Sequence, residues 1–353
     1  MTSRSGVPMG MNVLVTGGAG FMGSNLVMHL LGEGHRCTVF DNLSRPGVRA
    51  NLEWVRAAAA GRIEFAEGDI RDPEAVAAAA RDAEAIYHLA GQTAVTTSVV
   101  EPRADFEINA LGTLNVLEAA RLSRRQPLVI FASTNKVYGG LGDLEVVEQE
   151  QRYALAHGAG VSEAHPIEFH TPYGCSKGAA DQYVQDYGRM YGLRTAVLRL
   201  SCVYGPRQFG TEDQGWVAHF AIAAVLGRPL TIYGNGKQIR DILFIDDLVR
   251  LYAGFLRAPS PDVWGYVYNV GGGTAGTLSL LELLDLLAQE TGRRPSVGFE
   301  AWRPADQRAY VSDITRVRKA FGWQPEVSPR DGVHRLLAWA QAHRDLFASA
   351  GRR

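Results

Sequence analysis

The sequence predicts an α/β fold in which a doubly wound parallel sheet carries a smaller C-terminal lobe. Short apolar runs alternate with helix-like segments along roughly the first 200 residues. These runs are apolar throughout, which is typical of parallel strands covered by helices on both faces. Beyond about residue 200 the alternation ends, and loop-rich stretches with Gly, Pro and Trp separate the remaining helices.

The expected strands and helices follow one another at the spacing of β-α-β units. Strands are expected at 12–16, in a segment ending at 39–40, and at 63–65, 85–89, 128–132 and 195–200. The intervening helices are Phe21–Leu31, Pro73–Ala80, Ala104–Leu122 and Ser176–Tyr191. Helices of the lobe are expected at Trp216–Leu226, Leu278–Gln289 and Asp331–His343. The sheet unit then spans 11–200 with about 237–270, the lobe spans about 201–236 with 271–350, and 1–10 form a flexible tail.

The composition excludes several classes of function. Basic and acidic residues number 36 and 37, so no excess of charge favours nucleic acid or an anionic membrane. No apolar run approaches the ~18 residues of a membrane-spanning helix. Three separated cysteines exclude a disulfide framework or a Cys-rich zinc site and fit the cytoplasm. The nine histidines show no metal-binding spacing, so no metal is expected.

A glycine-rich loop follows the first strand and opens the first helix. Its glycines, Gly17, Gly20 and Gly23, permit a tight turn and a close approach of the backbone to a pyrophosphate, which then lies at the helix N-terminus. Asp41 stands 18 residues after Gly23, at the end of the second strand. A carboxylate there accepts both ribose hydroxyls and repels a 2′-phosphate. The sequence therefore predicts a Rossmann-type site for NAD rather than NADP, with Arg45 the one nearby feature against this choice.

Other candidate cofactor contacts lie where further strands end on the same sheet edge. Asp69 and Ile70 follow the third strand and are placed to contact adenine, and a further group follows the fourth strand. The candidates beyond the three glycines and Asp41 are Phe21, Met22, Asn42, Ser44, Arg45, Asp69, Ile70, Leu89, Ala90, Gln92, Ser133, Tyr173 and Lys177.

A tyrosine and a lysine four residues apart supply candidate proton-transfer groups. Tyr173 and Lys177 share one face of a helix, where the ammonium is expected to lower the phenol pKa from ~10 toward neutrality. The phenolate is then a general base for a sugar hydroxyl, and the Thr134 hydroxyl bonds to the same oxygen. Such a pair alone is frequent by chance, but it becomes specific downstream of a dinucleotide loop and Ser133-Thr134 at a strand end.

Together these features resemble the extended short-chain dehydrogenase/reductase superfamily, the NAD-dependent epimerases and dehydratases that modify nucleotide sugars. The resemblance covers essentially the whole chain after Met11. Its motifs occur in order: the glycine loop, Asp41, Asp69-Ile70, His88-Leu89-Ala90, Ser133-Thr134, Tyr173 with Lys177, Val203 to Arg207, Gln238 to Asp241, and Arg303 to Asp306. It implies a nucleotide-sugar substrate and a homodimer. In relatives the helices at 104–122 and 176–191 pair across a two-fold axis, here with Leu111, Leu114, Leu117, Tyr183 and Tyr187 as the apolar positions.

Finer motifs resemble one subgroup, the CDP-paratose 2-epimerases (CDP-tyvelose epimerases). They are Gly91 to Ser98, Asp105 to Ala110, Ser133 to Gly139, Pro172 to Tyr183 and Asp213 to Trp216, and the segment from Tyr138 to Tyr173 is long, as in that subgroup. The resemblance implies that C2 of a CDP-linked deoxyhexose is inverted through a 2-keto intermediate with tightly bound NAD.

The resemblance also implies the substrate contacts. Arg240 and Arg303 match the diphosphate ligands, for which a guanidinium fork is suited. The further candidates are Thr97, Ser133, Thr134, Asn135, Cys202, Arg207 and Asp306. Two positions depart from the pattern: Cys202 replaces an Asn that many relatives carry, and Phe244 replaces a His and is expected in the core.

Asn135-Lys136 bears on the type of reaction. The 4,6-dehydratases resemble this chain but carry Asp-Glu there, an acid and a base for elimination, so a dehydratase is poorly supported. A UDP-hexose 4-epimerase performs the same chemistry at another carbon and remains the main alternative. A non-catalytic NAD-binding scaffold is disfavoured by the intact Tyr-Lys pair, and a net reductase by Asp41.

Overall fold

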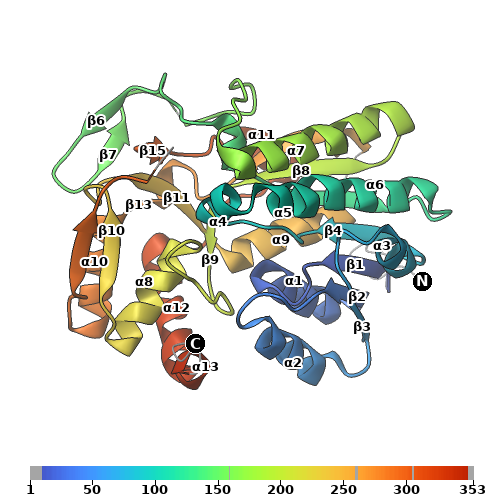
Figure 1. Cartoon of the computed structure of the whole chain (residues 1–353), viewed down its shortest axis with the longest axis horizontal. Coiled ribbons are helices and arrows are strands. Elements are labelled where there is room, and N and C mark those ends of the chain that lie inside the picture. Colours follow the sequence, from blue (N-terminus) through green and yellow to red (C-terminus); the bar gives the residue numbers. More distant parts are fainter. Residues whose placement is uncertain (1–9, 159, 259–260, 304–305, 349–353) are drawn as a thin grey trace.

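A seven-stranded parallel sheet forms the larger part of the protein, in a computed structural model that describes residues 10–158, 160–258, 261–303 and 306–348 (Figure 1). Its strand order is β12-β8-β5-β4-β1-β2-β3. The order reverses between β1 and β4, which creates the crevice where α/β sheets bind ligands. The strands are β1 (Asn12–Thr16), β2 (Arg36–Asp41), β3 (Ile63–Glu67), β4 (Ala85–His88), β5 (Leu128–Thr134), β8 (Thr195–Leu200) and β12 (Tyr266–Val270). The predicted doubly wound fold is confirmed.

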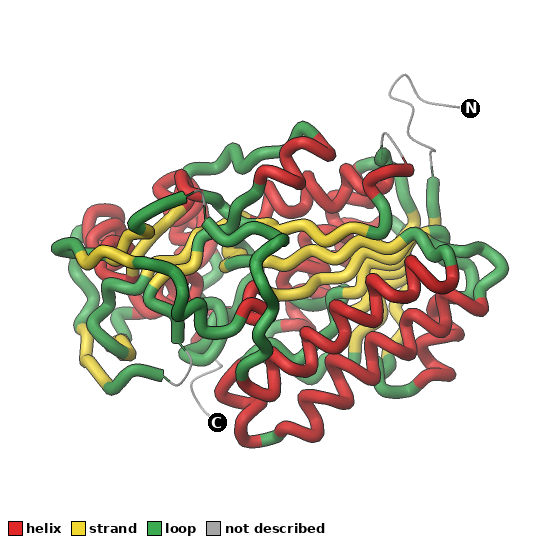
Figure 2. The backbone as a smooth tube through the Cα atoms, turned by 90° about the horizontal axis from the view of Figure 1, so that it is seen from above, coloured by secondary structure: helices red, strands yellow, loops and turns green. Residues whose placement is uncertain are grey.

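Helices cover both faces of this sheet (Figure 2). Consecutive residues of β1 enter opposite layers: Val13 and Val15 join one hydrophobic cluster, and Leu14 joins the other. The first layer contains α1 (Phe21–Gly32), α2 (Val48–Ala59) and α9 (Ile245–Leu256). The second contains α3 (Pro73–Ala80), α6 (Gly112–Leu122) and α7 (Thr171–Tyr191). Burial on both faces explains the uniformly apolar strand sequences.

Several boundaries differ from the predicted ones. The segment expected as one helix at 104–122 is α5 (Pro102–Phe106), a π-helical turn (Glu107–Leu111) and then α6, with α4 (Val95–Val100) before it. Helix α7 starts five residues earlier than expected, at Thr171. Helix α10 (Leu280–Thr291) starts two residues later than expected because Ser279 caps it together with Glu282. Helices α2 and α9 were not delimited from the sequence.

The lobe is built from small sheets and helices at the carboxyl ends of the large-sheet strands. One sheet combines β9 (Cys202–Tyr204), β11 (Ile239–Phe244), β13 (Thr277–Ser279) and β15 (Ala309–Tyr310). Two pairs join β10 (Leu230–Tyr233) to β14 (Val297–Glu300) and β6 (Val146–Glu148) to β7 (Tyr153–Leu155). The helices are α8 (Trp216–Leu226), α10, α11 (Thr315–Phe321), α12 (Pro329–Ala342) and α13 (Asp345–Ala348), with short 3-10 turns at Asn135–Tyr138, Pro261–Val263 and Thr274–Gly276.

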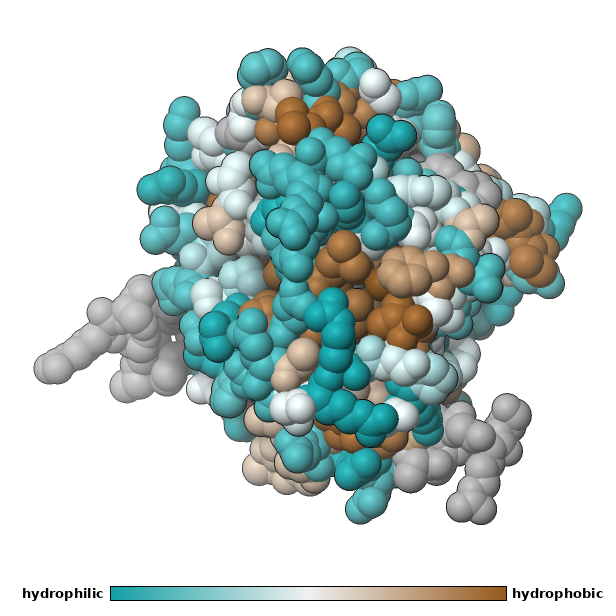
Figure 3. Space-filling model, turned by 90° about the vertical axis from the view of Figure 1, so that its left-hand side faces the viewer, coloured by the Kyte–Doolittle hydropathy of each residue, from teal (hydrophilic) through white to brown (hydrophobic). Residues whose placement is uncertain are grey.

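The lobe shares a continuous hydrophobic core with the α1 layer of the sheet. Phe244 lies in that core, 2% exposed, as predicted. The lobe end of the surface is largely hydrophilic, with hydrophobic residues gathered near its centre (Figure 3). No helix of the described ranges is both long and apolar enough to span a membrane. The flexible tail predicted for 1–10 lies, apart from Gly10, outside the described residues.

Candidate active site

The glycine-rich loop is shaped by close backbone contacts at the start of α1. Gly17 has a φ of +67°, and a Cβ added there would lie 2.8 Å from the Ala90 backbone nitrogen. A Cβ on Gly23 would overlap the Gly17 carbonyl oxygen. Gly20 is the N-cap of α1, and the first turn carries no acidic side chain. The N–H groups of Gly17 to Gly20 donate within the protein, so the loop supplies the space and the first turn of α1 is the part that can present its N–H groups to a pyrophosphate.

Asp41 ends β2 beside this loop. Its carboxylate accepts hydrogen bonds from the backbone N–H groups of Ala19, at 3.1 Å, and Leu43, at 2.9 Å. Burial raises its pKa, while these bonds and the Arg45 charge oppose that shift. Two backbone donors leave lone pairs on both oxygens, so the carboxylate keeps the capacity to accept ribose hydroxyls.

A cavity of about 360 Å³ runs along the switch point of the sheet. Every cofactor-binding residue predicted between Gly17 and Gln92 lines it. Asn42 donates to the Asp69 carboxylate at 3.1 Å, and a bidentate bond from Arg71 lowers the pKa of Asp69. Arg45 donates to the Thr93 hydroxyl at 2.8 Å. We call this cavity the cofactor cleft.

A loop of the lobe, residues 207–214, borders the cofactor cleft. This contact between the lobe and the cleft was not predicted from the sequence. Thr97 and Arg207, both predicted to contact substrate, line this cleft and not the second cavity. Arg207 has a φ of +71°, and its guanidinium lies 4.3 Å from the centre of the Trp54 ring. Asn51 donates to its carbonyl oxygen at 3.1 Å. From this loop, sequence reasoning missed the lining residues Gln208, Phe209, Thr211 and Gln214, and from the sheet side it missed Phe40, Pro46, Val48, Asn51, Gly68, Thr93 and Ile108.

The three predicted catalytic residues meet where β5 ends against the first turns of α7. Thr134 and Tyr173 are each 7% exposed, and the Thr134 hydroxyl lies close enough to the phenol to oppose the rise of its pKa. Lys177 is 5% exposed, donates to the Ala132 carbonyl oxygen at 2.6 Å and lies 4.1 Å from the centre of the Phe131 ring. The early start of α7 places Tyr173 one turn before Lys177 on the same face.

The protonation of this pair differs from the expected pattern. Burial raises the pKa of Tyr173 to about 12, although the Thr134 hydroxyl and the Arg45 charge oppose the shift. Burial lowers the pKa of Lys177 to about 7, and the carboxylates of Asp181 and Asp105 raise it only in part. The expected lowering of the phenol pKa is therefore not a property of the protein alone, because desolvation outweighs the neighbouring charge.

A buried ion pair holds Ser133 in place. Asp181, fully buried, accepts from the Ser133 hydroxyl at 2.7 Å and forms a bidentate pair with Arg199 at 3.0 Å. Arg199 also donates to the Tyr138 hydroxyl at 3.0 Å. Sequence reasoning missed this pair, although an arginine inside the apolar strand at 195–200 was a usable signal.

A second cluster is centred on the buried Asp105, whose charge acts on Lys177. Asp105 accepts from Gln92 at 2.9 Å, from Asn109 at 3.2 Å and, over a short contact, from Ser176. Asp105 comes from α5, Asn109 from the π-helical turn, Ser176 from α7 and Gln92 from the loop after β4, so the cluster joins four parts of the chain. Only Gln92 among them was predicted as a site residue.

A second cavity, of about 300 Å³, is lined by lobe residues and by Lys136 and Thr171, which are close in sequence to the catalytic residues. Ser133, Thr134, Asn135, Tyr173 and Lys177 themselves line neither cavity. Of the predicted substrate residues, Cys202, Arg240, Arg303 and Asp306 line it, and Gln214 lines both cavities. Asn135 is buried next to Thr134, and its amide oxygen accepts a hydrogen bond from the Thr134 hydroxyl at 3.4 Å. Arg240 pairs with Asp306 at 2.6 Å, and the Arg303 guanidinium lies 4.0 Å from the centre of the Tyr233 ring. We call this cavity the lobe cavity; sequence reasoning missed Thr96, Lys136, Trp216, Tyr233 and Gln238 in its lining.

Comparison with known proteins decides the family. The model of the NAD dependent epimerase/dehydratase family matches residues 13–271. The chain belongs to this family. The cofactor of the family is therefore NAD, and the glycine loop and Asp41 fit it.

Relatives within this family extend along almost the whole chain. The chain is 44% identical over 340 residues to a CDP-paratose 2-epimerase from Salmonella typhi, covering 94% of this chain and all of that protein. It is 35% identical over 328 residues to a UDP-glucose 4-epimerase from Mycolicibacterium smegmatis, covering 93% and 97%. Among solved structures, it resembles a Thermus thermophilus UDP-glucose 4-epimerase in complex with NAD, with a TM-score of 0.78, 33% identity and coverage of 94% and 100%.

Proposed function

We propose that the protein is an NAD-dependent nucleotide-sugar epimerase that inverts C2 of a CDP-linked deoxyhexose, as in the interconversion of CDP-paratose and CDP-tyvelose. The observation that carries this proposal is the 44% identity, over the full length of the relative, to a CDP-paratose 2-epimerase. The carboxylate-free Asn135-Lys136 pair beside Thr134 supports it, because elimination of water needs an acid and a base there.

The two cavities divide the ligands between them. In this proposal the cofactor cleft holds NAD, and the lobe cavity holds the nucleotide sugar, with its diphosphate on Arg240 and Arg303. The predicted units are residues 11–200 with about 237–270 for NAD, and about 201–236 with 271–350 for substrate, but each cavity takes residues from both units: Arg207 lines the cofactor cleft, and Arg240 lines the lobe cavity. Strand β11 lies in the first unit by sequence but pairs with strands of the lobe.

Tyr173 is proposed to take the proton of the C2 hydroxyl and return it at the end of the cycle. The Thr134 hydroxyl bonds to the same substrate oxygen, and the charged form of Lys177, which Asp181 and Asp105 favour, stabilises the phenolate. Bound NAD supplies reversible hydride acceptance, and the positive charge of its oxidised ring favours the phenolate. Between the two transfers the 2-keto sugar must present its other face.

A UDP-hexose 4-epimerase remains the second candidate, because a 4-epimerase of 35% identity also aligns over nearly all of this chain. The deciding experiment denatures the purified enzyme and identifies released NAD, then follows CDP-paratose, UDP-glucose and UDP-galactose by NMR. The proposal expects NAD and inversion at C2 of the CDP-sugar. Inversion only at C4 of a UDP-sugar would replace it with the second candidate.

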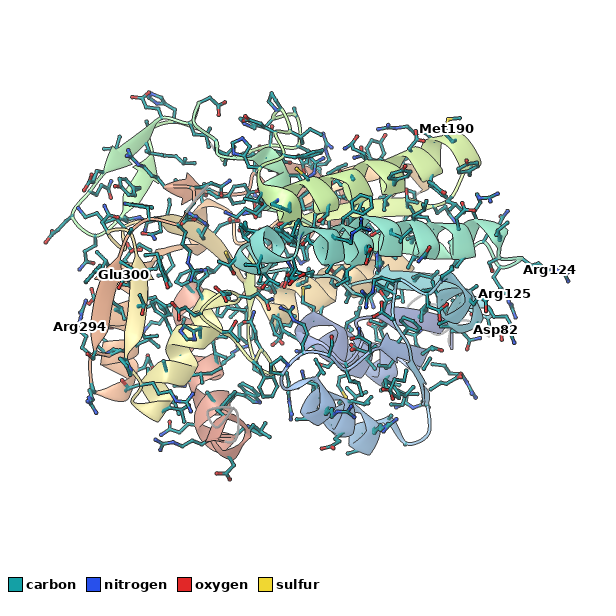
Figure 4. All side chains as sticks on the ribbon, viewed as in Figure 1. Asp82, Arg124, Arg125, Met190, Arg294 and Glu300 are labelled. Carbon is teal, nitrogen blue, oxygen red and sulfur yellow. The ribbon has the colours of Figure 1, made fainter. Side chains whose placement is uncertain are left out.

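We further propose a homodimer built on α6 and α7. Exposed apolar side chains gather on these helices and on α4 and α5 beside them, and Met190 points outward near the end of α7 (Figure 4). They are Val99, Val100, Phe106, Leu111, Leu122, Tyr183, Met190 and Tyr191. Leu117 and Tyr187, expected on this face, instead pack in the core.

An isologous contact between two copies would cover these side chains. Light scattering at micromolar concentration tests it: a dimer that dissociates in Leu122→Glu/Tyr191→Glu is expected, and a monomeric wild type would refute it. The three free cysteines fit the cytoplasmic location that we also propose.

A further inference from the structure

Lys136 connects the catalytic residues to the lobe cavity. Its backbone N–H donates to the Thr134 hydroxyl oxygen at 3.2 Å. Its carbonyl oxygen lies against the first turns of α7, where a Cβ added to Gly174 would come within 3.3 Å of it. The backbone of Lys136 is therefore fixed beside Thr134 and Tyr173, while its side chain lines the lobe cavity with Cys202 and Arg240.

The ammonium group of Lys136 lies in an environment that disfavours its charge. Burial is the main cause that lowers its pKa to about 8, and the charge of Arg240 lowers it further. Asp306 and Cys202 raise it, but the Asp306 carboxylate is already paired with Arg240 at 2.6 Å. The remaining titratable residues of the cavity are His170, Glu212, Asp213, Tyr233 and Arg303, and the two carboxylates among them face Arg303. A partly buried cation in this position gains most from an anion that the substrate brings.

The anionic groups of a nucleotide-diphosphate sugar are its phosphates. The phosphate that carries the sugar is attached through an oxygen to C1, and C2 is bonded directly to C1. C4 lies on the opposite side of the ring. A cation next to the catalytic residues can therefore reach this phosphate when C2 is presented to Tyr173, but it faces the far end of the sugar when C4 is presented.

We propose that the Lys136 ammonium binds the sugar-bearing phosphate of the substrate and thereby holds C2, rather than C4, against Tyr173. This inference rests on the proposed C2 epimerase function. It makes Lys136 a positioning residue, in addition to Arg240 and Arg303 at the diphosphate, and it explains why a lysine stands where elimination would need a carboxylate.

Titration calorimetry of the NAD-loaded enzyme with CDP and with CMP tests the contact. CDP carries the phosphate in question and CMP lacks it. In Lys136→Met, CDP binding should weaken by about 10- to 100-fold, the range for a lost charge-assisted hydrogen bond, while CMP binding stays nearly constant. Lys136→Arg should retain most of the CDP affinity, and Lys319→Met, on the exposed surface of α11, is the matched control. Equal losses for CDP and CMP, or no loss, would overturn the proposal.

The pH dependence provides a second readout that a merely structural lysine would not give. Below pH 8 the ammonium is charged, so CDP affinity should be constant. Above pH 8 the affinity should fall by up to about tenfold per pH unit, since binding must then restore a proton. In Lys136→Arg the guanidinium stays charged above pH 8, so the part of the decrease in CDP affinity that is due to Lys136 should disappear. Any decrease caused by ionisation of Cys202 or Tyr233 should remain. The same profile in wild type and Lys136→Arg would contradict the assignment.

The positioning role is tested by steady-state kinetics with CDP-paratose. Lys136→Met should lower kcat by about tenfold or more, besides raising KM, because the sugar is no longer held at C2. An effect on KM alone would overturn this half of the proposal. The wild-type product is determined first by NMR, and inversion at C4 would reject the proposed function. If wild type inverts C2 but Lys136→Met leaves the ratio of CDP to CMP affinity unchanged, only the role of Lys136 is rejected.

Discussion

The cofactor cleft and the lobe cavity are built in different ways. The cofactor cleft depends on backbone geometry: glycines that approach Ala90, the N-terminus of α1, and strand ends that bring Asp41 and Asp69 to one edge. The lobe cavity depends on side chains from β9, β11 and loops that are distant in sequence, including Arg240 and Asp306. The first site is therefore suited to a ligand shared by a whole family, and the second to a ligand that varies within it.

Tyr173→Phe tests whether turnover can be lost while ligand binding in the cofactor cleft and the lobe cavity is kept. It should reduce turnover by ~10²–10⁴-fold, the range for removal of a general acid–base group, while NAD content and CDP affinity stay close to wild type. Thr134→Ala should lose less, because it removes an orienting bond and not the proton acceptor. NMR of reactions with CDP-paratose, quenched at successive times, measures the turnover of both variants. Wild-type turnover in Tyr173→Phe would move the chemistry to another residue.

Asp181→Asn tests whether the catalytic end of β5 depends on the buried ion pair behind it. The variant leaves Arg199 without its carboxylate in the core, which should cost about 3–5 kcal/mol of unfolding free energy. Urea unfolding measures the loss, and Asp186→Asn on the exposed side of α7 is the control. Equal stability of the two variants would show that the pair is dispensable.

Asp41→Ala tests the cofactor cleft alone. NAD should bind about 10- to 100-fold more weakly, because charge-assisted bonds to ribose are lost, while CDP affinity and the unfolding midpoint change little. The amount of NAD retained after gel filtration, followed by calorimetry, measures it. Undiminished NAD retention would remove Asp41 from the cofactor site.

Arg240→Met and Arg303→Met test the lobe cavity alone. Arg240 is 7% exposed and Arg303 is more exposed, so the first substitution should weaken CDP binding by about tenfold and the second by less. NAD content should be unchanged in both. A loss of NAD in either variant would contradict the separation of the two cavities.

The contrast also explains what could be predicted from the sequence. The parallel sheet, the glycine loop, Asp41 and the Tyr173–Lys177 pair depend on local patterns that lie within one β-α unit. The roles of Asp181 with Arg199, and of Asp105 with Gln92, depend on contacts between elements that are distant in the chain, which spacing does not reveal. The predicted phenol pKa was wrong in direction for the protein alone because burial was not visible. Arg207 lines the cofactor cleft because its loop crosses from the lobe to α2, a path that no sequence pattern indicates.

The fate of the hydrogen at C2 tests the central claim most directly. CDP-paratose deuterated at C2 is incubated with the enzyme in ordinary water, and the unlabelled substrate is incubated in deuterated water. Oxidation and reduction by one bound NAD predict that the label stays at C2 of the epimer and that no solvent deuterium enters carbon. Only Tyr173 is placed as a proton acceptor for the sugar hydroxyl in this account. Stoichiometric solvent deuterium at C2, or inversion at C4 with C2 untouched, would contradict it.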